Sequence, residues 1–151
     1  MGKKLEMAAL FVALAMLAVG HALAAGSWPQ RAGDAPLQVV ALCQSRASHW
    51  EEGKIVSDSE LSIQRVVRGG ADSTIVVRQR GGEVDGIGQK VTHTILLDPG
   101  KRYLLFLTPL ADGRWEPTTK GVNVIATLPD VGETVGGDPL DQVIAELGGG
   151  A

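Results

Sequence analysis

Between residues 37 and 127 the chain consists of short apolar or alternating segments separated by glycine-rich turns, and this pattern most constrains the fold. Around Ile55, Leu61 and Ile63, apolar residues alternate with polar ones, which is typical of a strand with one buried face. Residues 102–108 include the run Tyr-Leu-Leu-Phe-Leu, which predicts a central strand covered on both sides. Because glycines and bulges bend the strands of small barrels, the pattern predicts a mainly β chain that forms a five- or six-stranded OB-like barrel.

The same pattern places the individual strands and turns. The alternation slips between Ile63 and Val66, and this slip predicts a β-bulge at Gln64–Arg65. Turn-forming residues predict turns at 98–101 and 111–113, and the glycines of residues 81–88 predict a barrel corner. The expected strands cover residues 37–46, 55–68, 73–80, 102–108, 114–117 and 122–127.

Two segments flank the predicted barrel of residues 37–127. Residues 25–36 are rich in Gly, Pro and Ala and predict a linker. Residues 128–151 predict a second linker followed by a short C-terminal helix over residues 139–147, with Asp138 as the N-cap and Pro139 at the first helical position. The helix has one apolar stripe, which we expect to pack on the barrel or against a partner; it comprises Leu140, Val143, Ile144 and Leu147.

The first 24 residues have the three parts of a secretory signal peptide. Lys3 and Lys4 provide the basic start, residues 7–20 carry no charge, and Ala22-Leu23-Ala24 matches the small-residue cleavage pattern. A membrane anchor is the alternative, but the uncharged run is shorter than the ~20 apolar residues of a spanning helix. We therefore expect cleavage near Ala24, a secreted or periplasmic protein, and no stable membrane span after cleavage.

Charge and cysteine content exclude several classes of function. If the leader is removed with Lys3, Lys4 and Glu6, 12 basic and 16 acidic residues remain, a net charge of −4. The basic residues are scattered, so nucleic-acid binding is disfavoured. Cys43 is the single cysteine, which excludes an intramolecular disulfide and a cysteine-based metal site. It lies in an apolar run, and we expect a buried thiol that acts as a small hydrophobic side chain.

Four motifs resemble, in order, those of small exported bacterial domains. They are Ser-His-Trp-Glu-Glu-Gly-Lys-Ile-Val-Ser at 48–57, Ile-Gln-Arg-Val-Val-Arg-Gly at 63–69, the corner Gly81-Gly82, and Gly-Lys-Arg-Tyr-Leu-Leu-Phe-Leu at 100–107. Those domains are similar to the OB-fold inhibitory domain of the tissue inhibitors of metalloproteinases. The resemblance covers residues 37–127 and implies the barrel fold.

The resemblance does not transfer the inhibitors' mechanism. In that family an amino-terminal cysteine chelates the zinc of the protease through its amine and carbonyl groups. Here the predicted mature chain begins near Ala25, and Cys43 lies inside a strand. No residue of this sequence can take that role.

The candidate partner-binding residues lie in two predicted turns. Trp50 is in a charged loop and Trp115 is next to a hairpin turn, and exposed tryptophans are common interface anchors. The alternative is that each tryptophan plugs one end of the barrel. Together with their acidic neighbours, the candidates are Trp50, Glu51, Glu52, Asp112 and Trp115.

The sequence contains no recognisable catalytic, metal or cofactor motif. His49 and His93 each have the chemistry of a base or ligand, but no metal-ligand spacing surrounds them. Ser45 and Ser48 lie near His49, yet a triad requires spatial roles rather than adjacency, and a polar hairpin tip is the favoured interpretation. We therefore expect no metal and no cofactor.

Three hypotheses about function remain. The favoured one is a non-enzymatic exported module that binds a protein or a component of the cell envelope. The second, an inhibitor or pro-domain-like regulator of a secreted metalloprotease, rests on analogy of fold. The third is a small hydrolase that uses His49 or His93.

Overall fold

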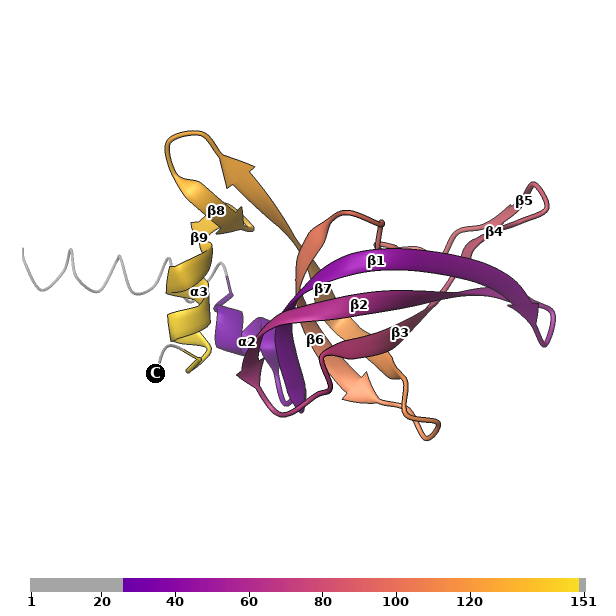
Figure 1. The fold of residues 1–151 in the computed structure, drawn as a ribbon, viewed down its shortest axis with the longest axis horizontal. Coiled ribbons are helices and arrows are strands. Elements are labelled where there is room, and N and C mark those ends of the chain that lie inside the picture. Colours follow the sequence, from indigo (N-terminus) through magenta and orange to yellow (C-terminus); the bar gives the residue numbers. More distant parts are fainter. Residues whose placement is uncertain (1–25, 150–151) are drawn as a thin grey trace, which may run out of the picture.

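The computed structural model describes residues 26–149, so the predicted signal peptide of residues 1–24 lies outside the described part. The described chain is mainly β, as expected, with two short helices (Figure 1). Its elements are α2 (Trp28–Ala32), β1 (Leu37–Glu51), β2 (Lys54–Arg68), β3 (Thr74–Arg80), β4 (Gly82–Val84), β5 (Ile87–Gln89), β6 (Arg102–Pro109), β7 (Trp115–Leu128), β8 (Gly132–Val135), β9 (Asp138–Pro139) and α3 (Leu140–Glu146).

Five of the strands form a partly closed ring. The main sheet has the order β3-β2-β1-β6-β7-β8-β9, and β3 also pairs with β7. That closing pair is parallel and joins Val77 to Trp115, whereas the other pairings of the sheet are antiparallel. The predicted OB-like barrel with a short C-terminal helix is confirmed, and β8 and β9 extend its sheet beyond the ring.

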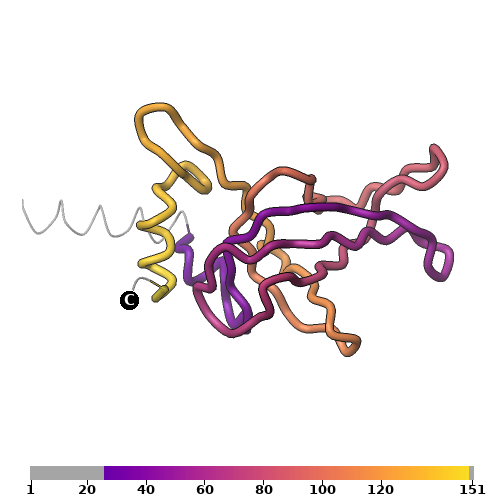
Figure 2. Tube along the Cα trace, in the orientation of Figure 1, coloured from indigo at the N-terminus to yellow at the C-terminus, as the bar shows by residue number. Residues whose placement is uncertain are grey.

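A long hairpin of β1 and β2 projects from the ring (Figure 2). Glu52 and Gly53 form its two-residue turn with φ values of 50° and 78°, the positive values of a type I′ turn. Val40 pairs with Arg65 and Ala41 with Ile63, so Gln64 has no partner of its own. The predicted bulge at Gln64–Arg65 is therefore confirmed.

Strand β6 separates two apolar cores, as its uninterrupted apolar run predicts. Tyr103, Leu105 and Leu107 belong to the core inside the ring, and Leu104 and Phe106 belong to the core on its outer face. All five side chains are buried. The buried thiol of Cys43 lies in the inner core, where burial raises its pKa, as expected for an inert cysteine.

The two helices cover the outer core, so the described segments on either side of the barrel are more ordered than the sequence predicted. The predicted linker 25–36 contains helix α2, which Ser27 and Gln30 begin with a reciprocal capping box. Trp28 of this helix is buried, and its Nε1 donates to Asp138 Oδ2 at 2.9 Å. Asp138 is thus engaged in β9 and is not the N-cap of α3, which Pro139 occupies.

The apolar stripe of α3 packs on the protein's own barrel. Leu140, Val143 and Ile144 are buried in the outer core together with Phe106 of β6. This resolves the alternative that the sequence left open between the barrel and a separate partner. No helix within residues 26–149 combines the length and apolar character needed to cross a membrane.

Two predicted details of the strands were wrong. The glycine-rich segment 81–88 is not a simple corner, because β4 and β5 form a separate hairpin that turns at Asp85-Gly86. The two short strands predicted at 114–117 and 122–127 are a single strand, β7. Its ladder skips from the pair Leu107–Pro117 to the pair Leu105–Val122, so residues 118–121 loop out of the ladder.

Candidate functional site

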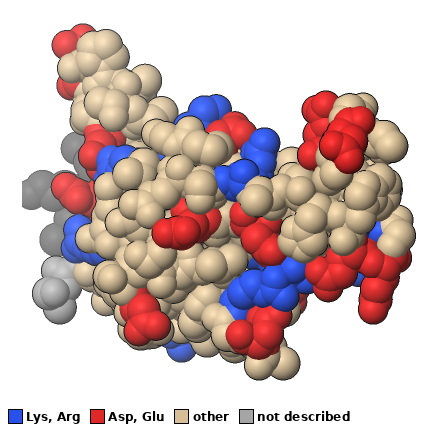
Figure 3. All heavy atoms as spheres, turned by 45° about the vertical axis from the view of Figure 1, so that its right-hand side comes forward, with Lys and Arg blue, Asp and Glu red and all other residues tan. Residues whose placement is uncertain are grey.

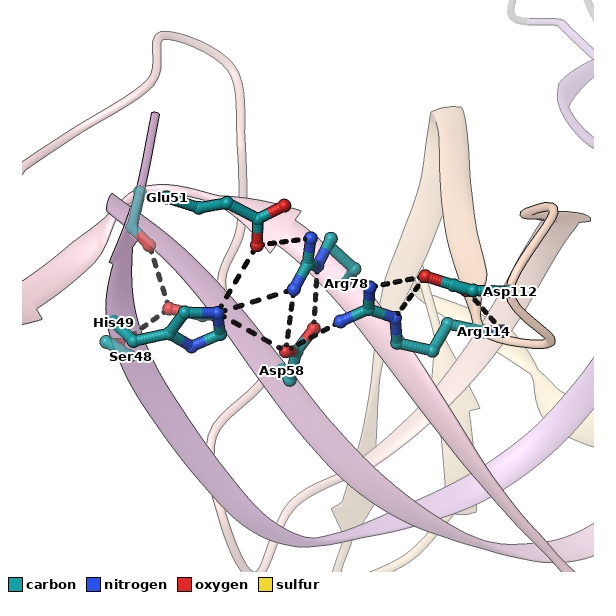
Figure 4. A network of polar contacts seen from close by, with 9 residues as sticks. Ser48, His49, Glu51, Asp58, Arg78, Asp112 and Arg114 are labelled. Atoms are coloured by element: carbon teal, nitrogen blue, oxygen red, sulfur yellow. Dashed lines mark hydrogen bonds and ion pairs between the residues drawn. The ribbon is translucent and has the colours of Figure 1, made fainter. Parts of the chain in front are cut away.

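A connected set of charged side chains covers one face of the β1–β2 hairpin and reaches the β6–β7 turn (Figure 4). We call it the hairpin network; its members are His49, Glu51, Asp58, Arg78, Asp112 and Arg114. Arg78 on β3 contacts Glu51 Oε2 at 2.7 Å through one terminal nitrogen, and its Nε donates to Asp58 Oδ1 at 3.0 Å. Side chains from β1, β2 and β3 are thereby joined.

Asp58 is the centre of the hairpin network. Its carboxylate accepts from Arg78 Nε and Nη2 at 3.0 and 3.1 Å, and from Arg114 Nη1 at 3.1 Å. Burial alone would raise the pKa of Asp58, but the hydrogen bonds and charge of Arg78, with the charge of Arg114, outweigh it and lower the pKa. The same contacts raise the pKa of Arg78, so both groups stay charged.

Asp112 extends the hairpin network into the β6–β7 turn. Its carboxylate accepts from the Arg114 backbone N–H at 3.0 Å and from Arg114 Nε at 2.9 Å. These hydrogen bonds lower the pKa of the Asp112 carboxyl group to about 2. Asp112, one of the predicted binding residues, is exposed, but its carboxylate is already hydrogen-bonded to Arg114.

His49 lies in the hairpin network without a nucleophile beside it. Its Nε2 is 3.4 Å from Glu51 Oε2 and 3.4 Å from Arg78 Nη2. Ser48 is the neighbouring residue in an extended strand and so faces the opposite side. There its hydroxyl lies 2.7 Å from Ser57 Oγ, which donates to the Gly81 carbonyl oxygen at 2.8 Å. The adjacency of serine and histidine in the sequence therefore does not become contact in the fold.

Trp50 is near the tip of the hairpin, and 44% of its surface is exposed. It lies on the same face as Ser48, toward the base of the β4–β5 hairpin, where a Cβ atom added to Gly82 would clash with the hydroxyl of Ser48. Glu52 forms the exposed turn beside it. Figure 3 shows acidic side chains gathered at the far ends of the two hairpins. Trp50 is thus an exposed aromatic residue in acidic surroundings.

Trp115 has a different role from Trp50. Its side chain is only partly exposed and packs against the inner core, while its backbone pairs with Val77 and closes the ring. The sequence pointed to both tryptophans as equivalent candidates. The fold leaves Trp50 exposed and packs Trp115 against the barrel core.

His93 is separate from these groups. It lies in the loop between β5 and β6, with a left-handed φ of 62°, and it lines a cleft of about 720 Å³. No group of three His, Cys, Asp or Glu side chains within residues 26–149 is arranged to hold a metal ion.

Sequence reasoning missed three members of the hairpin network: Asp58, Arg78 and Arg114. The alternation of β2 placed Asp58 on its polar face, and that was the only available signal. Its contact with Arg78 depends on the β2–β3 register, in which these two residues are paired. Comparisons of the chain with protein-family models, curated proteins and solved structures give no match.

Proposed function

We propose that this protein is a non-enzymatic exported module that binds a protein or envelope component through the tip of its β1–β2 hairpin. The observation that carries the proposal is the exposure of Trp50 on a hairpin that projects from the ring. Tryptophan is among the residues that contribute most to protein interfaces, because it buries a large area with few rotatable bonds. The contact surface consists of Trp50, Glu51 and Glu52, which we call the tip surface.

The hairpin network supports the proposal because it holds the tip surface in one conformation. Arg78 ties Glu51 and Asp58 to β3, and the hydroxyl pair of Ser48 and Ser57 ties the other face to Gly81. A binding loop that is already ordered loses less conformational entropy on association. The long hairpin therefore presents Trp50 without the cost of ordering a flexible loop.

The charges around Trp50 define the partner's chemistry. Glu51 and Glu52 are exposed on one hairpin, and Glu83 and Asp85 lie on the other. Complementary charge steers association and suppresses binding of like-charged surfaces. We therefore expect a partner surface with an apolar pocket for the indole ring and a basic rim.

The polar groups near His49 already hydrogen-bond to one another or to the backbone, and this favours a binding function over hydrolysis. Asp58 already accepts hydrogen bonds from two arginines, and Ser57 donates to a carbonyl group. A general base or nucleophile needs a free lone pair directed at the substrate. His49 meets arginine and carboxylate groups instead of a serine or cysteine.

A quantitative pull-down from envelope and culture fluid tests the proposal. The wild-type protein is compared with Trp50→Ala and with a control, Val131→Ala, which alters an apolar residue that is 59% exposed in the β7–β8 turn. We expect one saturable partner whose recovery falls with Trp50→Ala but not with Val131→Ala. Equal recovery with all three proteins would refute the assignment of the tip surface. Identification of the partner as a metalloprotease would favour the inhibitor hypothesis.

A further inference from the structure

The ring of strands has an opening that forms a cleft of about 720 Å³. Strands β3 and β7 pair at Val77–Trp115 only, and beyond that pair Gln79 and Arg80 of β3 face residues 118–120 of the looped-out segment of β7 across the cleft. The volume lies within the range of about 300–1,000 Å³ that is typical of sites for small molecules. The opening is a consequence of the single closing pair.

Specific hydrogen bonds hold both walls of the cleft. On one side, the Gln79 amide donates to the Ile95 carbonyl oxygen at 2.6 Å and accepts from the Leu97 N–H at 3.1 Å. On the other side, Asn123 Nδ2 donates to the carbonyl oxygens of Leu104 and Lys120, both at 3.2 Å. Hydrogen bonds therefore tie both walls of the cleft to the barrel, including the β5–β6 loop that carries Ile95.

The charges in the cleft differ from those of the rest of the protein. Four cations line it. Arg78 is paired with Glu51 and Asp58, whereas Arg31, Arg80 and Lys120 form no ion pair within residues 26–149. Arg31 is held in place by stacking on the Trp28 ring, with its guanidinium carbon 4.8 Å from the ring centroid. The one carboxylate in the lining is Glu116. A chain with a net charge of −3 thus gathers unpaired cations around one cavity.

The remaining lining indicates what else the ligand carries. Val91 and Ile95 on the opposite wall are 38% and 51% exposed, although both are apolar. The cleft therefore combines unpaired cations with an apolar wall.

We propose that this cleft binds a small organic anion that has a carboxylate, sulfate or phosphate head and an apolar body. Arg80 and Lys120 contact the head, and Val91 and Ile95 contact the body. The inference is independent of the function proposed for the tip surface, because Trp50, Glu51 and Glu52 do not line the cleft.

Titration of the ¹⁵N-labelled protein, followed by amide NMR spectra, tests this inference. The probes are 4-phenylbutyrate, its uncharged analogue 4-phenylbutanol, and pyrophosphate as a head group without an apolar body. We expect 4-phenylbutyrate to shift the amide signals of residues 91–95 and 118–123 saturably, and to bind at least about tenfold more tightly than the alcohol or pyrophosphate.

A matched pair of variants distinguishes a site from general attraction of anions. Arg80→Gln/Lys120→Gln removes the two exposed cations of the cleft, and Arg65→Gln/Arg68→Gln removes two exposed cations of β2 that do not line it. We expect the first to weaken 4-phenylbutyrate binding at least about tenfold, and the second by less than about twofold. No saturable shift with 4-phenylbutyrate, equal binding of the alcohol, or equal losses in both variants would overturn the proposal.

Discussion

Replacement of Gly121 by alanine should destabilise the protein through a backbone clash alone. A Cβ atom at this position would lie 2.4 Å from the Phe106 carbonyl oxygen, 2.7 Å from the Thr118 nitrogen and 2.9 Å from the Thr118 carbonyl oxygen. All three are backbone atoms, so no side chain can rotate out of the way. Gly121 closes the looped-out segment of β7, which explains why the two strands approach so closely there.

The expected loss follows from the size of such clashes. Overpacking costs about 1–3 kcal/mol, and the reduced freedom of the unfolded chain returns about 0.4–1 kcal/mol, which leaves a net loss of about 1–2 kcal/mol. Urea denaturation should show this as a lower midpoint with an unchanged slope. The melting temperature should fall by about 4 °C per kcal/mol for a domain of this size.

Gly70→Ala is the matched control for Gly121→Ala. An added Cβ at Gly70 meets no atom within 4 Å, and neither glycine has a left-handed φ. We expect the control to have unchanged or slightly increased stability. If Gly121→Ala were as stable as Gly70→Ala, the looped-out geometry of β7, and with it one wall of the cleft, would be refuted.

Three further predictions concern polar contacts. Asp58→Asn should cost about 1–2 kcal/mol at pH 7, because two arginines lose their shared carboxylate. Folding lowers the pKa of Asp58, so the stabilisation that its carboxylate provides is complete above the ordinary pKa of about 4 and is lost as the pH falls through the folded pKa. The free energies of unfolding of the wild type and of Asp58→Asn should therefore converge as the pH is lowered from 7 to 2. In a double-mutant cycle of Trp28→Phe and Asp138→Asn, a coupling of about 1 kcal/mol is expected from their 2.9 Å hydrogen bond, and additive losses would argue against docking of α2 on β9. Ser57→Ala should cost about 1–2 kcal/mol because a buried carbonyl group loses its donor. Ser59→Ala removes a buried hydroxyl group beside the Cys43 thiol, which is a weak hydrogen-bond partner, and should be close to neutral in the same denaturation assay.

The elements that the sequence predicted well are those whose signal is local. The apolar run of residues 103–107 indicated a strand buried on both faces, and the broken alternation at Gln64 located a bulge. Helix α2 also had a local signal, the capping box of Ser27 and Gln30, but the Gly- and Pro-rich composition around it suggested a linker. A capping motif was the more specific evidence there, because it satisfies particular backbone groups.

The parts that sequence reasoning missed depend on register and on long-range pairing. The unpaired residues Gln44 and Val67 each shift the β1–β2 ladder, and the partners of Asp58 depend on how β2 aligns with β3. The cleft depends on a parallel contact between strands that are far apart in the sequence. Periodicity in one strand carries no information about either relation.

Site-specific photocrosslinking at the hairpin tip tests the central claim most directly. A benzophenone amino acid replaces Trp50 in one protein and Val131 in another, and both are irradiated with envelope and culture fluid. The two positions are comparably exposed and lie in different turns of the fold. The account predicts one saturable adduct from position 50 that excess unlabelled protein suppresses, and no such adduct from position 131. The same adducts from both positions, or none from position 50 while a partner is still recovered by pull-down, would contradict it.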